Sequence, residues 1–153
     1  MSISPSNLIT VGWREWVGLP DLGVWDIKAK IDSGARTSCL HTSQYEIFGK
    51  EGVEWVRFTL HPLKKNLQLE TIAEAPVRDY RIVRDSGGHE EKRPFIQTTL
   101  MVGSTVWPIE ISLSNRERMK FRMLLGRTSM ANRVLIDCSR SYLSKPRPRL
   151  RKS

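Results

Sequence analysis

The chain has 153 residues, of which 39% are hydrophobic and 27% are charged, and its net charge is +9. A chain of this length and composition is too apolar to be disordered and is long enough for one globular domain with its own core. Because it has no apolar run near the ~18 residues of a membrane span and no signal-peptide pattern at residues 1–7, we expect a cytoplasmic protein that makes no membrane contact.

Proline and glycine divide the sequence into short segments in which apolar and polar residues alternate. This alternation predicts strands at residues 11–19, 24–31, 38–48, 53–60, 71–84, 94–102, 105–113 and 133–137, and one short helix at 127–132. Turn residues separate the strands, as at 20–23 and 85–88. We therefore expect an all-β, mostly antiparallel domain that forms a closed or sandwich-like barrel.

Positive charge is concentrated at the C-terminus. Residues 144–153 contain no acid, two prolines and five cations, namely Lys145, Arg147, Arg149, Arg151 and Lys152. We predict an N-terminal extension at 1–8, a folded domain at 9–143 and a disordered basic tail at 144–153. The tail is equally compatible with a contact to RNA, a ribosome or an acidic protein and with a solubilising end that has no partner.

The turn after the predicted strand at 24–31 carries the first chemical signal. Its residues are Asp32, Ser33, Gly34 and Ala35, so a carboxylate stands at the end of an alternating strand. Gly34 allows a sharp turn and can offer its N–H to the carboxylate. The Ser33 hydroxyl can brace the turn, and the small Ala35 suits a crowded position. Asp-Ser-Gly is also ordinary turn chemistry, so this tetrapeptide alone is a weak indication of catalysis.

A second apolar run, at residues 123–125, ends in Gly126 and Arg127. An Asp-Ser/Thr-Gly-Ala turn together with a distant apolar-apolar-Gly-Arg turn resembles the layout of retropepsin-type aspartic proteases. The resemblance implies a retropepsin-like closed barrel whose one short helix follows the Leu-Leu-Gly-Arg turn.

Such a protease needs two carboxylates that share one proton around one water, because two negative charges ~3 Å apart cannot both ionise cheaply. One Asp-Ser-Gly-Ala turn per chain therefore predicts a homodimer in which each copy supplies Asp32. Asp26 and Asp137 are alternative second acids within the chain, and Asp137 is the more plausible of the two because it follows an apolar strand.

Longer segments resemble one bacterial and archaeal family. The matching segments are residues 12–17, 19–20, 29–38, 40–41, 93–94, 109–116, 123–127, 135–137 and 141–142, together with Met119. The family is usually labelled ATP-dependent zinc protease and is also described as RimK-associated, RimB-type retropepsin-like peptidases. The resemblance covers the domain at 9–143. This chain departs from the family pattern at Ser33, where Thr is common, and at Cys138, where Pro is expected.

The resemblance implies that Asp32, Ser33 and Gly34 form the catalytic turn. It also implies a link to RimK, an ATP-grasp ligase that adds glutamates to the C-terminus of a small-subunit ribosomal protein, with the peptidase acting on that product. Arginines suit such an acidic substrate because guanidinium groups pair with carboxylates. The candidate substrate-binding residues are Ala35, Arg36, Thr37, Arg78, Arg81, Arg84, Arg93 and Arg127. Each arginine also has a plain interpretation as a solvated surface charge.

The zinc and ATP of the family label find no support in the residues. His41, His61 and His89 are isolated, and no His-Glu-x-x-His motif or glycine-rich phosphate loop is present. We therefore expect no metal and no other cofactor, with ATP belonging to the ligase.

A binding module is the alternative to a peptidase. A non-catalytic β-barrel could hold acidic protein tails or RNA through its arginines and basic tail. Stacking aromatics would favour RNA, whereas the tryptophans here alternate with polar residues in a way that predicts core packing. These residues are Trp13, Trp16, Trp25, Trp55 and Trp107.

Overall fold

The structure is a computed structural model that describes residues 8–62, 70–85, 87–115 and 121–145. Its strands are β1 (Ile9–Val11), β2 (Arg14–Leu19), β3 (Val24–Ile31), β4 (Ser38–His41), β5 (Gln44–Lys50), β6 (Val53–Leu60), β7 (Thr71–Pro76), β8 (Asp79–Arg84), β9 (Glu90–Val102), β10 (Thr105–Ser114), β11 (Met123–Leu125) and β12 (Val134–Ile136). The short segments η2 (Pro20–Leu22) and α1 (Arg127–Met130) are helical. The all-β class is confirmed, and α1 directly follows the Leu-Leu-Gly-Arg turn.

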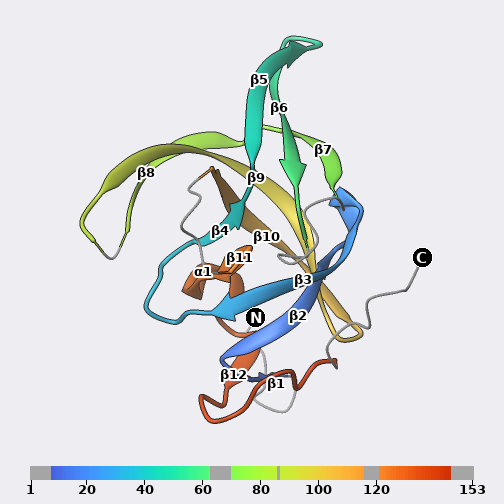
Figure 1. Cartoon of the computed structure of the whole chain (residues 1–153), viewed down its shortest axis with the longest axis vertical. Helices are drawn as coiled ribbons and strands as arrows, with labels where there is room; N and C mark the ends of the chain where they lie inside the picture. Colours follow the sequence, from blue (N-terminus) through green and yellow to red (C-terminus); the bar gives the residue numbers. More distant parts are fainter. Residues whose placement is uncertain (1–7, 63–69, 86, 116–120, 146–153) are drawn as a thin grey trace.

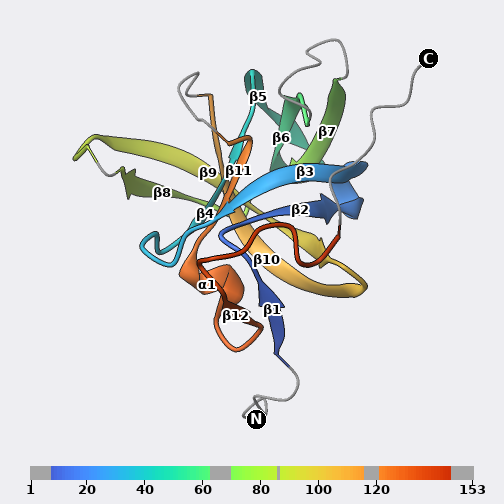
Figure 2. The ribbon, with the colours of Figure 1, turned by 60° about the horizontal axis from the view of Figure 1, so that its bottom comes forward.

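The largest sheet closes into a barrel. Its strands lie in the order β10-β4-β11-β3-β2-β9-β8, and β9 pairs with β10 to complete the ring. Closure depends on the length of β9, whose first half pairs with β8 and whose second half pairs with β10 and, at Met101, with Gly18 of β2. A separate sheet of β5, β6 and β7 extends from one side of the barrel (Figures 1 and 2).

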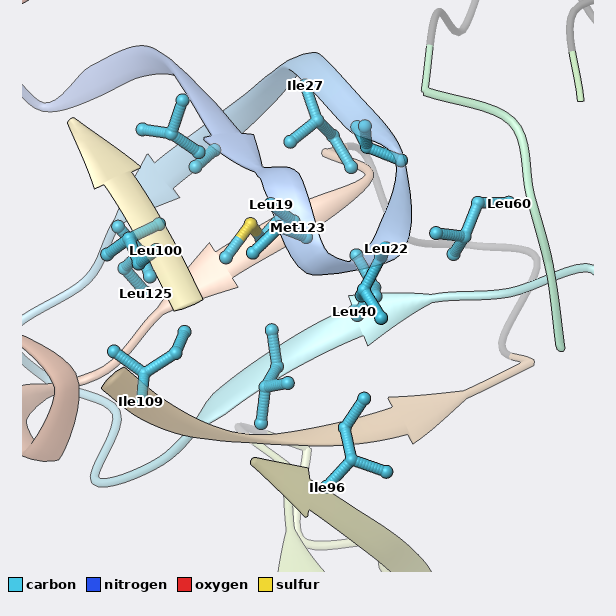
Figure 3. Packing of buried hydrophobic residues seen from close by; sticks show 14 of the residues in the cluster. Leu19, Leu22, Ile27, Leu40, Leu60, Ile96, Leu100, Ile109, Met123 and Leu125 are labelled. Atoms are coloured by element: carbon cyan, nitrogen blue, oxygen red, sulfur yellow. The ribbon is translucent and has the colours of Figure 1, made fainter. Parts of the chain in front are cut away.

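The barrel interior is filled by apolar side chains from alternate positions of its strands. The largest fully buried side chains of the described residues are Phe58, Phe95, Leu19, Ile27, Leu40, Leu60, Ile96, Leu100, Ile111, Leu113, Met123 and Leu125, several of which meet in Figure 3. Phe58 and Leu60 belong to β6, so the smaller sheet is anchored to the same hydrophobic cluster as the barrel.

The strand predicted at 38–48 is two strands in different sheets. The Thr42 N–H donates to the Ser114 carbonyl of β10, whereas the next N–H, from Ser43, donates to the Thr59 carbonyl of β6. The buried Thr42 hydroxyl lies 2.7 Å from both the Thr59 and the Gln44 carbonyl oxygens, donates its one hydrogen between them, and stabilises this change of sheet. Both segments are extended strands separated by two residues, so the sequence pattern did not reveal the change of sheet.

The strand predicted at 71–84 also divides. The Val77 N–H donates to the Glu54 carbonyl of β6, and the Arg78 N–H donates to the Phe95 carbonyl of β9. The chain therefore leaves the small sheet at Val77 and joins the barrel at Arg78, where β8 begins the hairpin with β9.

Two of the tryptophans predicted to pack in the core do so. Trp16 and Trp107 are buried, whereas Trp13 and Trp25 are 36% and 59% exposed. Trp13 packs on the surface instead, edge-on to Phe121 and beneath the Arg14 guanidinium. The core expectation is therefore wrong for Trp13 and Trp25, because alternation does not distinguish the inner face of a barrel from an outer face that other side chains partly cover.

No helix in the described ranges is long and apolar enough to cross a membrane. Cys39 is a buried free cysteine and Cys138 is an exposed one.

A buried carboxylate attaches the C-terminal segment to β2. Glu15 is fully buried, and its oxygens accept the N–H of Gly12 at 2.6 Å, of Leu143 at 2.9 Å and of Ser144 at 2.9 Å, and the Ser144 hydroxyl at 2.6 Å. Lys145 then pairs with Asp26 of β3 at 2.8 Å. The segment at 143–145 is thus held against β2 and β3.

Replacing Glu15 with alanine is expected to lower the free energy of unfolding by about 3 kcal/mol, because its hydrogen bonds to a charged acceptor are lost and buried donors remain. Calorimetry should show Tm falling by about 10 °C. The matched control is Glu70→Ala, which removes an exposed glutamate and should leave Tm unchanged. Equal Tm values for the two variants would contradict the structural role of Glu15.

Candidate active site

The Asp32 turn begins where β3 ends. The Asp32 N–H donates to the Leu125 carbonyl at 2.9 Å, and the Ala35 N–H donates to the Asp32 carbonyl at 3.2 Å. The Gly34 N–H donates to Asp32 Oδ1 at 3.0 Å, which is the contact that the sequence predicts for this glycine. The half-buried carboxylate is held by the turn on one side and faces a cavity on the other.

The Gly126 turn lies directly beside the Asp32 turn. This follows from the parallel pairing of β11 with β3, in which Leu125 stands opposite Ile31. The Arg127 N–H then donates to the Ala35 carbonyl at 2.8 Å. Most pairings in the described ranges are antiparallel, as alternation and short turns predict, and three are parallel, namely β10–β4, β11–β3 and β1–β12. One of these three brings the two turns of the site together.

A buried hydroxyl network supports the Gly126 turn, and sequence reasoning missed it. Ser38 Oγ accepts the Gly126 N–H at 3.0 Å and lies 2.6 Å from Ser129 Oγ. The Ser112 hydroxyl donates to the Ser38 carbonyl at 3.1 Å, and the Trp107 indole N–H donates to the Ser129 carbonyl at 2.8 Å. One feature of the sequence could have revealed this network. Ser112 lies between two apolar residues of the strand predicted at 105–113, and a buried hydroxyl requires a hydrogen-bond partner.

A cavity of about 990 Å³ opens between the Asp32 turn and the β8–β9 hairpin. Both ribbon views place this hairpin on the same side of the barrel as the loop between β3 and β4 (Figures 1 and 2). The lining from the turn comprises Asp32, Gly34, Ala35, Arg36 and Thr37, and the charged lining from other elements comprises Arg81, Arg84, Asp85, Arg93 and Glu110. The hairpin thus has the position of a flap over Asp32.

Two of the predicted substrate-binding arginines lie elsewhere. Arg78 lines a smaller neighbouring cavity of about 290 Å³. Arg127 does not line the main cavity. Its guanidinium instead donates to the Ser33 carbonyl at 3.0 Å. Arg127 therefore braces the backbone of the Asp32 turn, a contact that a motif search alone does not reveal.

Most of the predicted substrate-binding arginines form ion pairs with acidic side chains of the same chain. The pairs are Arg78 with Glu110 at 2.8 Å, Arg81 with Asp79 at 3.0 Å and Glu110 at 2.8 Å, Arg84 with Glu90 at 2.5 Å, and Arg93 with Glu91 at 3.1 Å. Hydrogen bonds to Asp79 and then to Glu110 raise the pKa of Arg81. Arg93 is buried and also donates to Cys39 Sγ at 3.4 Å.

The hairpin is also tied to the small sheet. The Tyr80 hydroxyl donates to Glu54 of β6 at 2.6 Å, and this hydrogen bond raises the pKa of Tyr80 to about 12. This hydrogen bond joins the base of the hairpin to β6.

Neither alternative second acid lies at the cavity. Asp26 pairs with Lys145. Asp137 accepts the Ser139 hydroxyl at 2.6 Å and the Ser139 N–H at 3.0 Å, and these bonds, assisted by the Arg140 charge, lower the pKa of Asp137. Of the chain's own carboxylates, Asp85 and Glu110 line the cavity with Asp32.

A zinc ion does not fit the residues that the structure describes. Within the described ranges, no group of three or more His, Cys, Asp or Glu side chains is close enough to hold a metal ion. The buried His41 lies at the end of β4, where its backbone N–H donates to the Arg122 carbonyl at 2.8 Å. The exposed His89 lies at the hairpin turn near Asp85.

The profile of the RimB-like family, described as "Retropepsin-like aspartic endopeptidase RimB", matches residues 10–147. The chain belongs to the RimB-like family. Family membership confirms the retropepsin-like resemblance. The description of the family mentions neither zinc nor ATP.

Two relatives of this RimB-like chain are larger proteins named "Probable alpha-L-glutamate ligase". The protein from Desulfotalea psychrophila is 43% identical over 139 aligned positions, and the match covers 88% of this chain and 30% of the relative. The protein from Shewanella pealeana is 42% identical over 136 residues, 89% of this chain and 30% of the relative. The chain thus spans less than a third of the length of these relatives.

A solved structure from Legionella pneumophila, of a protein with unknown function, has the same fold as this RimB-like chain. Its TM-score is 0.73 at 25% sequence identity, and the match covers 90% of this chain and 98% of the other. This likeness supports the barrel architecture and carries no information about activity.

Proposed function

We propose that the chain is a cytoplasmic aspartic-type peptidase that acts as a homodimer on acidic peptides. The observation that carries the proposal is the parallel pairing of β11 with β3, which sets the Asp32 turn beside the Gly126 turn at an arginine-bearing cavity. Membership of a retropepsin-like aspartic endopeptidase family supports the same activity.

In the proposed mechanism, the Asp32 carboxylates of two copies share one proton across the two-fold axis of the dimer. The ionised carboxylate takes a proton from the water as its oxygen attacks the peptide carbonyl carbon, and the protonated carboxylate donates to the carbonyl oxygen. The C–N bond then breaks as the leaving nitrogen takes a proton. The Gly34 N–H holds one Asp32 oxygen, and Ser33 and Arg127 keep the turn in shape.

The candidate substrate is a glutamate-extended C-terminal tail, such as that of a ribosomal protein. Arginines at the cavity suit a run of carboxylates. Relatives named glutamate ligase, in which the matching segment is 30% of the chain, support a functional link between this domain and an enzyme that adds glutamate.

The test is mass spectrometry of a peptide that ends in four glutamates, incubated with the purified protein. We expect shortened products, and we expect slower cleavage of the matched glutamine peptide because it offers no carboxylate to the arginines. A chain that ends at Lys145 should cleave the short peptide as well as the full chain does. Equal rates on both peptides, or loss of activity on removal of 146–153 alone, would contradict the acidic cavity as the recognition site.

Chelation provides a further test of the mechanism. Because the proposed chemistry uses carboxylates alone, EDTA should leave the rate unchanged. Loss of activity on chelation, with recovery on addition of zinc, would support a zinc enzyme instead.

The second candidate function is a non-catalytic module that presents acidic tails to a ligase. It is favoured by the ligase names of relatives in which the matching segment is a minor part of the chain. Tight binding of the glutamate peptide without any shortening would support this function over the peptidase.

A further inference from the structure

The arginines at the main cavity differ in whether a carboxylate already holds them. Arg81, Arg84 and Arg93 each lie within 3.1 Å of an acidic partner in the same chain. A guanidinium that is already paired gains little from a substrate carboxylate, because one ion pair is exchanged for another.

One of these pairs joins the hairpin to the barrel, and another lies within the hairpin. Arg81 joins β8 to Glu110 of β10, and its guanidinium also lies over the Phe95 ring at 4.3 Å. Arg84 and Glu90 stand opposite each other in the β8–β9 register. Arg81 therefore ties the flap to the barrel, whereas Arg84 pairs the two strands of the flap with each other.

Arg36 differs from the other arginines of the cavity. It is exposed, it lines the cavity, and its guanidinium has no acidic partner among the described residues. Its backbone is nevertheless fixed, because the Thr128 N–H of α1 donates to the Arg36 carbonyl at 3.0 Å. A fixed backbone with an uncompensated guanidinium is suited to bind an incoming carboxylate with little loss of order.

We infer, on the basis of the proposed function, that Arg36 is the residue that selects for a carboxylate side chain in the substrate. Arg81 holds the flap against β10, Arg84 is neutralised within the flap, and both contribute little to this selection.

The sequence distance limits where the selected carboxylate lies. Arg36 is four residues after Asp32 in the same turn, so the two Cα atoms are at most ~14 Å apart. An extended substrate advances about 3.3 Å per residue. Arg36 therefore binds a substrate glutamate within a few residues of the scissile bond. More distant glutamates contribute to the affinity only through screened electrostatic attraction.

The experiment measures binding without cleavage, using the Asp32→Asn chain and a fluorescent peptide that ends in four glutamates. A series of peptides replaces one glutamate at a time with glutamine, and each is titrated against Asp32→Asn with and without Arg36→Gln. We expect Arg36→Gln to raise Kd about tenfold. Double-mutant cycles should couple Arg36 to one glutamate position and leave the other positions additive.

Three further variants complete the comparison. Lys30→Gln removes an exposed cation outside the cavity and should change Kd less than about twofold. Arg84→Gln should raise Kd less than about threefold, because Glu90 already neutralises this arginine. Arg36→Lys should recover part of the affinity, since it retains the charge and loses the planar fork.

The possible outcomes separate this inference from the proposed function. Tight peptide binding that Arg36→Gln leaves unchanged, or a loss spread equally over all glutamate positions, would overturn the role of Arg36 alone. Failure of the Asp32→Asn chain to bind any glutamate peptide would overturn the acidic substrate and this inference together. An unchanged Tm for Arg36→Gln would show that a loss of binding does not arise from unfolding.

Discussion

Replacement of Asp32 by asparagine is expected to lower the rate of peptide hydrolysis by at least about 10³-fold, because the amide cannot take a proton from the attacking water. The fold should be retained, since an asparagine side-chain oxygen can still accept the Gly34 N–H that Asp32 Oδ1 accepts. The measurement is the initial rate on the glutamate-extended peptide, followed by mass spectrometry, with Tm as the check on folding. A variant that keeps full activity would remove Asp32 from the mechanism.

The other aspartates that could complete a dyad within one chain provide the controls. Asp26→Asn and Asp137→Asn are expected to keep activity, because these residues pair with Lys145 and with Ser139 away from the cavity. Loss of activity in Asp137→Asn at an unchanged Tm would place the second acid within the chain.

Mixtures of wild-type and Asp32→Asn chains test the homodimer directly. If each active site requires Asp32 from two copies, activity should fall with the square of the wild-type fraction once subunits have exchanged. A linear fall would mean that each chain carries a complete site of its own.

Gly126→Ala is expected to lower the free energy of unfolding by about 3 kcal/mol or more and to reduce hydrolysis strongly. A Cβ at this position would lie 2.5 Å from the Thr37 carbonyl oxygen and 2.6 Å from its carbon, and both are backbone atoms. The Gly126 turn would have to move away from the loop that carries Asp32. Thermal unfolding and the rate on the glutamate peptide measure the two effects.

Gly49→Ala is the matched control for this substitution. A Cβ at Gly49 meets no atom within 4 Å, so Tm and activity should remain those of the wild type. Wild-type stability and activity in Gly126→Ala would show that the close approach of the two turns is unnecessary.

The sequence determined the local features of this protein. Alternation located most strands, because a strand with one buried face must place apolar residues at every second position. It also identified the Asp32 turn and the N–H that Gly34 donates to it, since both depend on a few adjacent residues.

Only the tertiary structure decided which distant segments meet. Alternation states that a segment is a strand and does not name its partner or direction, so the parallel pairing of β11 with β3 could not be derived from it. For the same reason, alternation did not reveal that the strands predicted at 38–48 and 71–84 each divide between two sheets. The arginines show the same limit in electrostatic terms. Whether Arg81, Arg127 or Arg36 can receive a substrate carboxylate depends on the acid or carbonyl that the fold places beside each one.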